Sequence, residues 1–74
     1  MHITVDLSGQ LSLSLPRHQA LEIPPGTTAG QVADRLGLNL EEIGLITING
    51  VQSELLDALP PDCRLCFFPY LSGG

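Results

Sequence analysis

The residues that most clearly suggest a chemical function in this sequence are the last two, Gly73-Gly74. Glycine has no Cβ, so a Gly-Gly segment can lie extended in a channel that is too narrow for any side chain. We therefore expect that the carboxylate of Gly74 can be delivered to the active site of another enzyme. The alternative interpretation of the same two residues is a frayed chain end or an expression scar.

Cys63 and Cys66 form a C-x-x-C pair, a spacing found in redox and metal sites. Redox pairs open a helix after a strand, whereas this pair enters an apparent strand. Strand side chains alternate, so positions three apart face opposite sides of a sheet. Two thiolates are also only half of a structural zinc site. We interpret each cysteine as a small apolar residue and expect no metal site.

The other polar residues do not form a catalytic set. His2 and His18 are isolated, without a partner at the spacing of a metal site or a triad, and we interpret both as surface residues. The scattered carboxylates are Asp34, Glu41, Glu42, Glu54 and Asp57. Their spacing argues against general acid–base work and favours a solvated acidic face, part of which recognises a basic partner surface. We expect no autonomous active site.

The composition is that of one small acidic domain. Of 74 residues, 43% are hydrophobic and 15% are charged, which is typical of a globular chain rather than a disordered one. The net charge is −5, and the basic side chains include no lysine. Nucleic-acid binding needs clustered Lys and Arg, so we expect no nucleic-acid partner and instead a protein partner with a positive docking face.

The sequence also lacks the features of a membrane protein. Its apolar runs are shorter than the ~18 residues that a membrane span needs. Met1–Asp6 lacks the basic region and the apolar stretch of a signal peptide. We therefore expect a cytoplasmic protein with no membrane contact.

Alternation of apolar and polar residues predicts the strands. Ile3–Leu7 has the period of a half-buried strand, and Arg64–Pro69 is the last strand. Three placements are open for the second strand: Leu11–Leu15, Gln19–Ile23, or one long interrupted strand. We favour a strand at Gln19–Ile23 paired with the first, with Leu11–Leu15 partly extended beside it.

One short helix is predicted over about Thr28–Leu36. Thr28 and Gln31 fit a capping box, and Gly37 stands where a left-handed C-cap belongs. Val32 falls at helical spacing on the side that should face the core.

A hairpin follows the helix. Asn39–Glu42 is expected to add one helical turn, and Leu45–Ile48 is a β-branched strand. Asn49-Gly50 is the strongest short-range turn signal, and Val51 begins a brief return strand. The order is therefore strand, strand, helix, strand, short strand, last strand.

This order predicts an α+β fold. One helix packed across a mixed sheet of about four or five strands buries an apolar face of each. The long excursion between the helix and the last strand allows that strand to pair in the middle of the sheet. The arrangement resembles the β-grasp, or ubiquitin-like, fold over residues 1–69, followed by a flexible tail, 70–74, that ends in Gly-Gly.

Several segments are characteristic of one family, in addition to the opening strand. They are Ile23–Thr28, Val32–Gly37, Ile48–Val51, and Leu65–Pro69 followed by Leu71–Gly74. With them the whole chain resembles the prokaryotic ubiquitin-like sulfur carriers of the MoaD/ThiS type, which include the small subunit of molybdopterin synthase and the thiamine sulfur carrier. A Phe-Phe-Pro strand end before a short tail to Gly-Gly is more similar to the molybdopterin synthase subunit.

The resemblance implies the chemistry of a carrier. A ubiquitin-activating-type adenylating enzyme would use ATP to convert the carboxylate of Gly74 into an acyl-adenylate. A sulfur donor would then displace AMP and leave a thiocarboxylate, with Gly73 granting access to the site. The sulfur would pass to an acceptor in a second partner, such as the large subunit of molybdopterin synthase. The chain would hold no permanent cofactor and would act as a carrier or as the small subunit of a sulfurtransferase.

Alternation also predicts a docking surface. Leu65 and Phe67 should face the helix, which leaves Cys66 and Phe68 on the other side of the sheet. An exposed Phe beside a reactive tail is typical of a partner anchor, although Phe68 could instead close the edge of a small core. The candidate partner-binding residues are Cys66, Phe68, Tyr70, Leu71 and Ser72.

Other functions remain open at this stage. The chain could serve thiamine synthesis or another sulfur pathway. It could be a protein modifier joined through Gly74 to lysines of other proteins. It could also be a β-grasp interaction module whose tail does not react. An independent enzyme is the class that the residues favour least.

Overall fold

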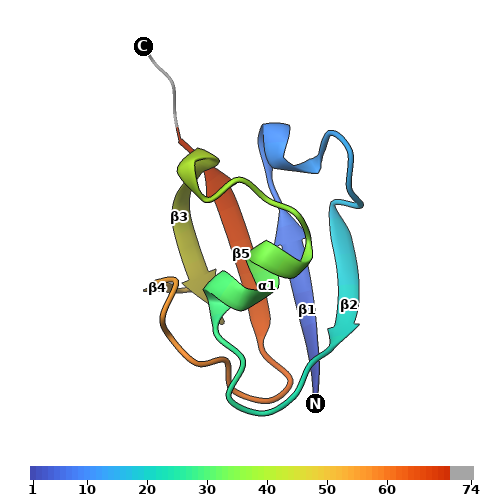
Figure 1. The fold of residues 1–74 in the computed structure, drawn as a ribbon, viewed down its shortest axis with the longest axis vertical. Coiled ribbons are helices and arrows are strands. Elements are labelled where there is room, and N and C mark those ends of the chain that lie inside the picture. The colour runs from blue at the N-terminus through green and yellow to red at the C-terminus, as the bar shows by residue number, and fades with distance from the viewer. Residues whose placement is uncertain (71–74) are drawn as a thin grey trace.

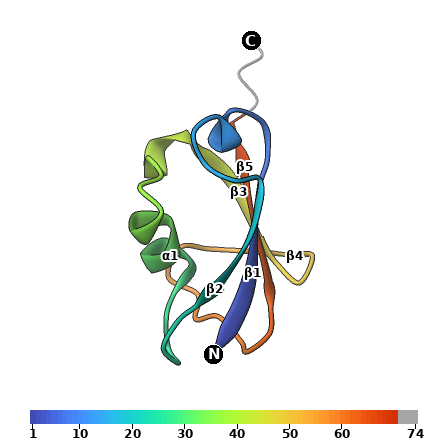
Figure 2. The same cartoon turned by 90° about the vertical axis from the view of Figure 1, so that its right-hand side faces the viewer.

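The computed structural model describes residues 1–70 of the chain. These residues form a five-stranded sheet with a short α-helix across one face (Figures 1 and 2). The elements are β1 (His2–Leu7), the 3₁₀ helix η1 (Gly9–Ser12), β2 (His18–Glu22), α1 (Ala29–Arg35), the 3₁₀ helix η2 (Leu40–Glu42), β3 (Ile43–Ile48), β4 (Val51–Ser53) and β5 (Arg64–Pro69).

The last strand lies in the middle of the sheet. The strand order is β2-β1-β5-β3-β4, with β5 parallel to β1 and antiparallel to β3. This mixed sheet with a helix on one face is the β-grasp fold, so the predicted fold class and the central position of the last strand are confirmed. The division between residues 1–69 and the tail stays a prediction. Within residues 1–70, no helix is long and apolar enough to cross a membrane.

The core lies between the sheet and α1. Val5 of β1, Val32 of α1, and Leu65 and Phe67 of β5 expose none of their surface to solvent. Cys66 and Phe68, which alternate with these two residues in β5, are partly exposed, as the alternation predicted. No polar or charged side chain of the described residues is buried. The core therefore rests on apolar packing from one face of the sheet and one face of the helix.

Local signals place the helix and the hairpin. Oγ1 of Thr28 accepts a hydrogen bond of 3.2 Å from the N–H of Gln31, and Oε1 of Gln31 accepts one of 2.9 Å from the N–H of Thr28. Gly37 has a φ of 76°, the left-handed conformation expected of a C-cap. Asn49 and Gly50 also have positive φ, as a two-residue hairpin turn requires. The predicted capping box, C-cap and hairpin turn are confirmed.

The region between the first two strands corrects the sequence analysis. β2 pairs with β1 near the favoured position, but Leu11–Leu15 is not extended. Gly9 has a φ of 57° and starts the tight turn of η1, which buries Leu11 and leaves Leu13 85% exposed. The alternation of leucine and serine was misleading because the turn, rather than a pleated strand, decides which leucine reaches the core.

Two leucines provide a direct test of this fold. We expect Leu65→Ala to lower the free energy of unfolding by about 3 kcal/mol, because it opens a cavity in the core. Leu13→Ala makes the same chemical change at an exposed site and should stay within about 0.5 kcal/mol of the parent protein. Urea unfolding followed by circular dichroism measures both. Equal losses in the two variants would contradict the assigned core.

Candidate functional site

The candidate site lies where β5 ends. Phe68 projects from the face of the sheet opposite α1 and pairs with Leu45 of β3. A hollow of about 540 Å³ opens beside it, and we call it the Phe68 hollow. Its lining residues are Ser8, Gly9, Gly44, Leu45, Phe68, Pro69 and Tyr70. Tyr70 is 61% exposed, so the hollow is an accessible apolar surface at the end of the central strand.

The chemistry of the Phe68 hollow is that of recognition. Of its lining residues, Tyr70 alone has a titratable side chain, and the rest supply apolar surface, a hydroxyl group and backbone. A general acid or base would need a titratable group within reach of the reacting atoms. The Phe68 hollow therefore offers a mainly apolar surface that a partner could contact.

The structure brings some of the predicted site residues together. Phe68 and Tyr70 both line the hollow. Cys66 lies on the same face of β5, next to β1 rather than at the hollow, with its Sγ 3.9 Å from Oδ2 of Asp6. The other predicted residues lie outside the described part of the chain, so their roles stay predictions. They are Leu71, Ser72, Gly73 and Gly74.

Two glycines at this position were missed by the sequence analysis. A Cβ at Gly44 would lie 2.9 Å from N and Cα of Tyr70, and a Cβ at Gly9 would lie 3.2 Å from Cγ of Pro69. Both glycines therefore allow the end of β5 to pass close to the neighbouring backbone. A glycine inside an apolar strand is a known signal of close approach. The signal was present, but the prediction began this strand at Leu45, two residues after its observed start at Ile43, and so left Gly44 outside it.

Gly44 also forms a β-bulge. Ile43 pairs with Pro69 and Leu45 pairs with Phe68, which leaves Gly44 as an extra residue in β3. The extra residue returns Ile43 to the core face, where it is buried together with Ile46. Because of the bulge, Ile43 at the start of β3 is buried in the core, while the next two residues, Gly44 and Leu45, line the Phe68 hollow.

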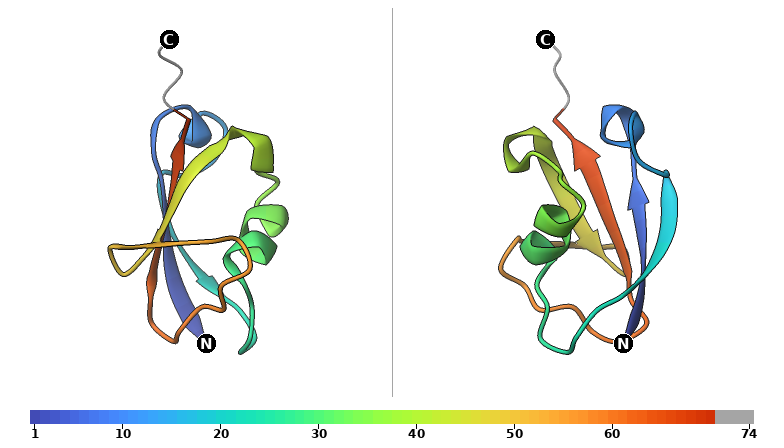
Figure 3. Two further views of the ribbon diagram at one scale, coloured as in Figure 1. Left: turned by 90° about the vertical axis from the view of Figure 1, so that its left-hand side faces the viewer. Right: turned by 45° about the vertical axis from the view of Figure 1, so that its right-hand side comes forward.

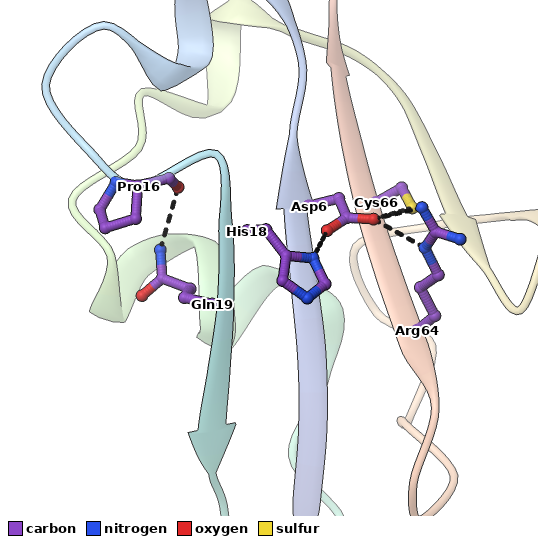
Figure 4. A network of polar contacts seen from close by, with 6 residues as sticks. All are labelled: Asp6, Pro16, His18, Gln19, Arg64 and Cys66. Atoms are coloured by element: carbon purple, nitrogen blue, oxygen red, sulfur yellow. Dashed lines mark hydrogen bonds and ion pairs between the residues drawn. The ribbon is translucent and has the colours of Figure 1, made fainter.

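A polar cluster lies further along the open face, across β2, β1 and β5 (Figure 4). Oδ1 of Asp6 contacts Nδ1 of His18. Oδ2 of Asp6 accepts a hydrogen bond of 2.7 Å from Nε of Arg64 and forms an ion pair with Nη2 of the same guanidinium group, at 2.6 Å. The bond with His18, and after it the contacts with Arg64, hold the pKa of Asp6 below its ordinary value of 3.8. Asp6 in turn raises the pKa of Arg64.

Both histidines lie on the surface, as predicted, with side chains that are 73% (His2) and 67% (His18) exposed, but the prediction that they are isolated was wrong. His18 stands directly opposite Asp6 in the pairing of β1 with β2, although the two are 12 positions apart in sequence. Nε2 of His2 lies 3.9 Å from Oε1 of Glu22 in the same ladder. These pairs depend on strand register, and sequence spacing does not reveal register.

The two cysteines differ in burial, as expected if one thiol faces the core and the other does not, although Cys63 lies just before β5 rather than in it. Cys63 is buried and Cys66 is partly exposed, and both are free thiols. Burial raises the pKa of the Cys63 thiol, which makes it a poor nucleophile. Among residues 1–70, no three His, Cys, Asp or Glu side chains are grouped so that they could hold a metal ion.

Comparisons with known proteins place the fold. No family model and no curated protein matches the sequence. Among solved structures, SAMP1 from Haloferax volcanii is 21% identical, with a TM-score of 0.80 over 100% of both chains. A chain of the complex of subunits 1 and 2 of the molybdopterin-converting factor from Helicobacter pylori is 14% identical, with a TM-score of 0.67 over 100% of both chains. Urm1 from Trypanosoma brucei is 20% identical, with a TM-score of 0.62 over 99% of this chain and 95% of the other. The resemblance found in the sequence is thus confirmed at the level of the fold.

The Asp6 cluster predicts a pH-dependent contribution to stability. We expect Asp6→Asn to lower the free energy of unfolding by about 1 kcal/mol at about pH 7. Because the folded-state pKa of Asp6 lies below 3.8, this contribution is complete above that pH and is lost as pH falls through the folded-state pKa. Urea unfolding of both proteins across this range measures it. A difference that is unchanged under strongly acidic conditions would refute the role of the carboxylate.

Gly44 predicts a local effect at the end of β5. We expect Gly44→Ala to displace Tyr70, whose N–H donates a 3.3 Å hydrogen bond to the carbonyl of Glu42. The variant should therefore show a shifted Tyr70 amide resonance and faster hydrogen exchange there. Leu45→Ala is the matched control, because it shortens an adjacent exposed side chain without adding an atom near the backbone. An unchanged Tyr70 amide in Gly44→Ala would show that the close approach is not restrictive.

Proposed function

We propose that this protein is a ubiquitin-like sulfur carrier that acts through the carboxyl group of Gly74. The observation that carries the proposal is the end of β5, where an exposed apolar hollow adjoins the strand from which the sequence continues to Gly73-Gly74. A reactive terminus needs a nearby surface by which enzymes recognise it, because the terminal residues themselves offer almost no side chain. The fold shared with SAMP1, Urm1 and a chain of the molybdopterin-converting factor complex also supports this function.

The proposed reaction cycle has three steps. An oxygen of the Gly74 carboxylate attacks the α-phosphorus of ATP in an adenylating enzyme, which forms an acyl-adenylate and releases pyrophosphate. A sulfur nucleophile at the oxidation level of sulfide then attacks the acyl carbon, AMP leaves, and a thiocarboxylate remains. When that sulfur passes to an acceptor, water restores the carboxylate. The chain contributes a terminal carboxyl group and a docking surface, while its partners supply ATP, acids and bases.

The pathway we favour is molybdopterin synthesis in the cytoplasm. The Phe-Phe-Pro end of β5 supports this choice, as does the fold shared with a chain solved in a complex of subunits 1 and 2 of a molybdopterin-converting factor. In this proposal the Phe68 hollow receives the adenylating enzyme first and the large synthase subunit later. Supply of sulfur to thiamine or to another product would use the same terminal chemistry with a different acceptor.

A second candidate function is protein modification. A solved structure of the same fold, 20% identical to this chain, is that of small archaeal modifier protein 1 from H. volcanii. Such a modifier would share the adenylation step, after which a lysine amine of a target protein would displace AMP. This chain has no lysine, so it could be attached to other proteins but could not form lysine-linked chains of itself.

Intact-mass spectrometry tests the proposal. The protein is incubated with ATP, a sulfide donor and the adenylating enzyme of its host. We expect a mass gain equal to the exchange of one oxygen for sulfur, located at Gly74 by fragmentation. No gain, with the same enzyme active on a known carrier, would overturn the proposal and favour an unreactive interaction module. Conjugates of high mass that disappear on deletion of Gly74 would favour the modifier.

Two variants separate the terminus from the docking surface. Gly73→Ala should keep the urea midpoint and block thiocarboxylate formation, because its added methyl group obstructs a narrow active-site channel. Phe68→Ala should weaken binding to the adenylating enzyme while lowering the free energy of unfolding by only about 1 kcal/mol. A loss of about 3 kcal/mol or more, with normal activation of the folded protein, would instead make Phe68 a core residue.

A further inference from the structure

A second exposed apolar surface lies on the side of the domain formed by α1, η2 and the segment after β4. Figure 3 shows that segment crossing from the edge of the sheet to the side of the helix. Leu40, Leu55 and Leu56 separate two hollows there, and we call these three residues the leucine ridge. One hollow, of about 410 Å³, extends to β3 and β4, and the other, of about 350 Å³, extends to α1. Leu56 is 88% exposed and Leu40 is 45% exposed.

Two carboxylates line the hollows of the leucine ridge, and two more are next to its leucines in sequence. Glu54 lines the first hollow and Asp34 lines the second, while Glu41 and Asp57 are the chain neighbours of exposed leucines. None of the ion pairs among residues 1–70 involves these four carboxylates. The nearest basic residue in sequence is Arg35, whose Nη1 instead donates a 2.9 Å hydrogen bond to the carbonyl of Glu22 at the other side of the domain. The apolar surface therefore has acidic residues at its border that no ion pair within residues 1–70 neutralises, although Oδ2 of Asp57 accepts a 2.9 Å hydrogen bond from the N–H of Glu54.

We propose that the leucine ridge is a docking surface for a basic amphipathic helix of a partner protein. A ridge between two hollows can be straddled by side chains from successive turns of a helix. The acidic border complements lysines or arginines beside the apolar stripe of that helix. Strand addition fits poorly at this edge, because β4 has only three residues to offer a new strand.

The leucine ridge adjoins the Phe68 hollow but differs from it in charge. The first hollow of the ridge shares Gly44 and Leu45 with the Phe68 hollow, so the two surfaces adjoin. Carboxylates line both hollows of the ridge but not the Phe68 hollow. The ridge can therefore select a partner by charge, independently of the chemistry at Gly74.

A synthetic peptide tests the inference. The probe is a helical peptide with leucines at i, i+3, i+4 and i+7 and lysines on both sides of that stripe. Its control is a peptide of the same composition in scrambled order. We expect titration calorimetry to show binding of the ordered peptide, and Leu40→Ser with Leu56→Ser to weaken it by about tenfold or more. Leu13→Ser removes an equally exposed leucine elsewhere and should leave the affinity unchanged, as should Phe68→Ala.

Charge variants give an independent measurement. Asp34→Asn with Glu54→Gln should weaken binding and reduce its salt dependence, with no change in the urea midpoint. The inference is overturned by absent binding, by equal binding of the scrambled peptide, or by full affinity in the double leucine variant. The inference would also be overturned if Phe68→Ala abolished binding while the leucine variants kept it, because the peptide would then occupy the Phe68 hollow.

Discussion

The hydrogen bonds that hold β5 between β1 and β3 are the interaction on which the rest of the structure depends. Besides the strand ladders, Ser8 donates to the carbonyl of Phe67 on one side, and the N–H of Asn49 donates to the carbonyl of Arg64 on the other. Oδ1 of Asn49 also accepts from the N–H of Arg64. A strand that is paired on both sides cannot shift its register without breaking two ladders. Its end is therefore a fixed point from which a terminal segment can be presented to a partner.

Because β5 lies in the middle of the sheet, its side chains alternate between the core and the open face. Leu65 and Phe67 fill the core, while Cys66 and Phe68 are left on the face that no helix covers. In a domain this small, the core cannot spare many apolar residues. An apolar residue on the open face therefore contributes less to stability than its size allows, and a role in recognition gives a physical reason for it to remain there.

The sequence revealed the parts of the fold that local chemistry decides. The capping box at Thr28, the hairpin turn at Asn49 and the alternation in β5 each depend on residues close together in the chain, and each was placed correctly. The errors have two causes. Leu13 was expected to be extended because the alternation of leucine and serine was given more weight than the local turn at Gly9. His18 was expected to be isolated because the register of β1 with β2 cannot be deduced from spacing. The same limit applies to the Phe68 hollow, whose glycines are distant in sequence and meet only at the end of β5.

Register also explains how a protein with few basic groups acquires two differently charged sides. Asp6 engages His18 and Arg64, and Glu22 lies beside His2 and accepts from Arg35. These contacts bring two of the three arginines, Arg64 and Arg35, to Asp6 of β1 and Glu22 of β2. The carboxylates between residues 34 and 57 therefore carry much of the net charge of −5. In the proposed carrier function, the surface of the domain is what successive partners would recognise. The apolar hollow at the end of β5 and the acidic, leucine-bearing side would give two partners different features to recognise, and because the two surfaces share Gly44 and Leu45, a large partner on one would hinder binding at the other.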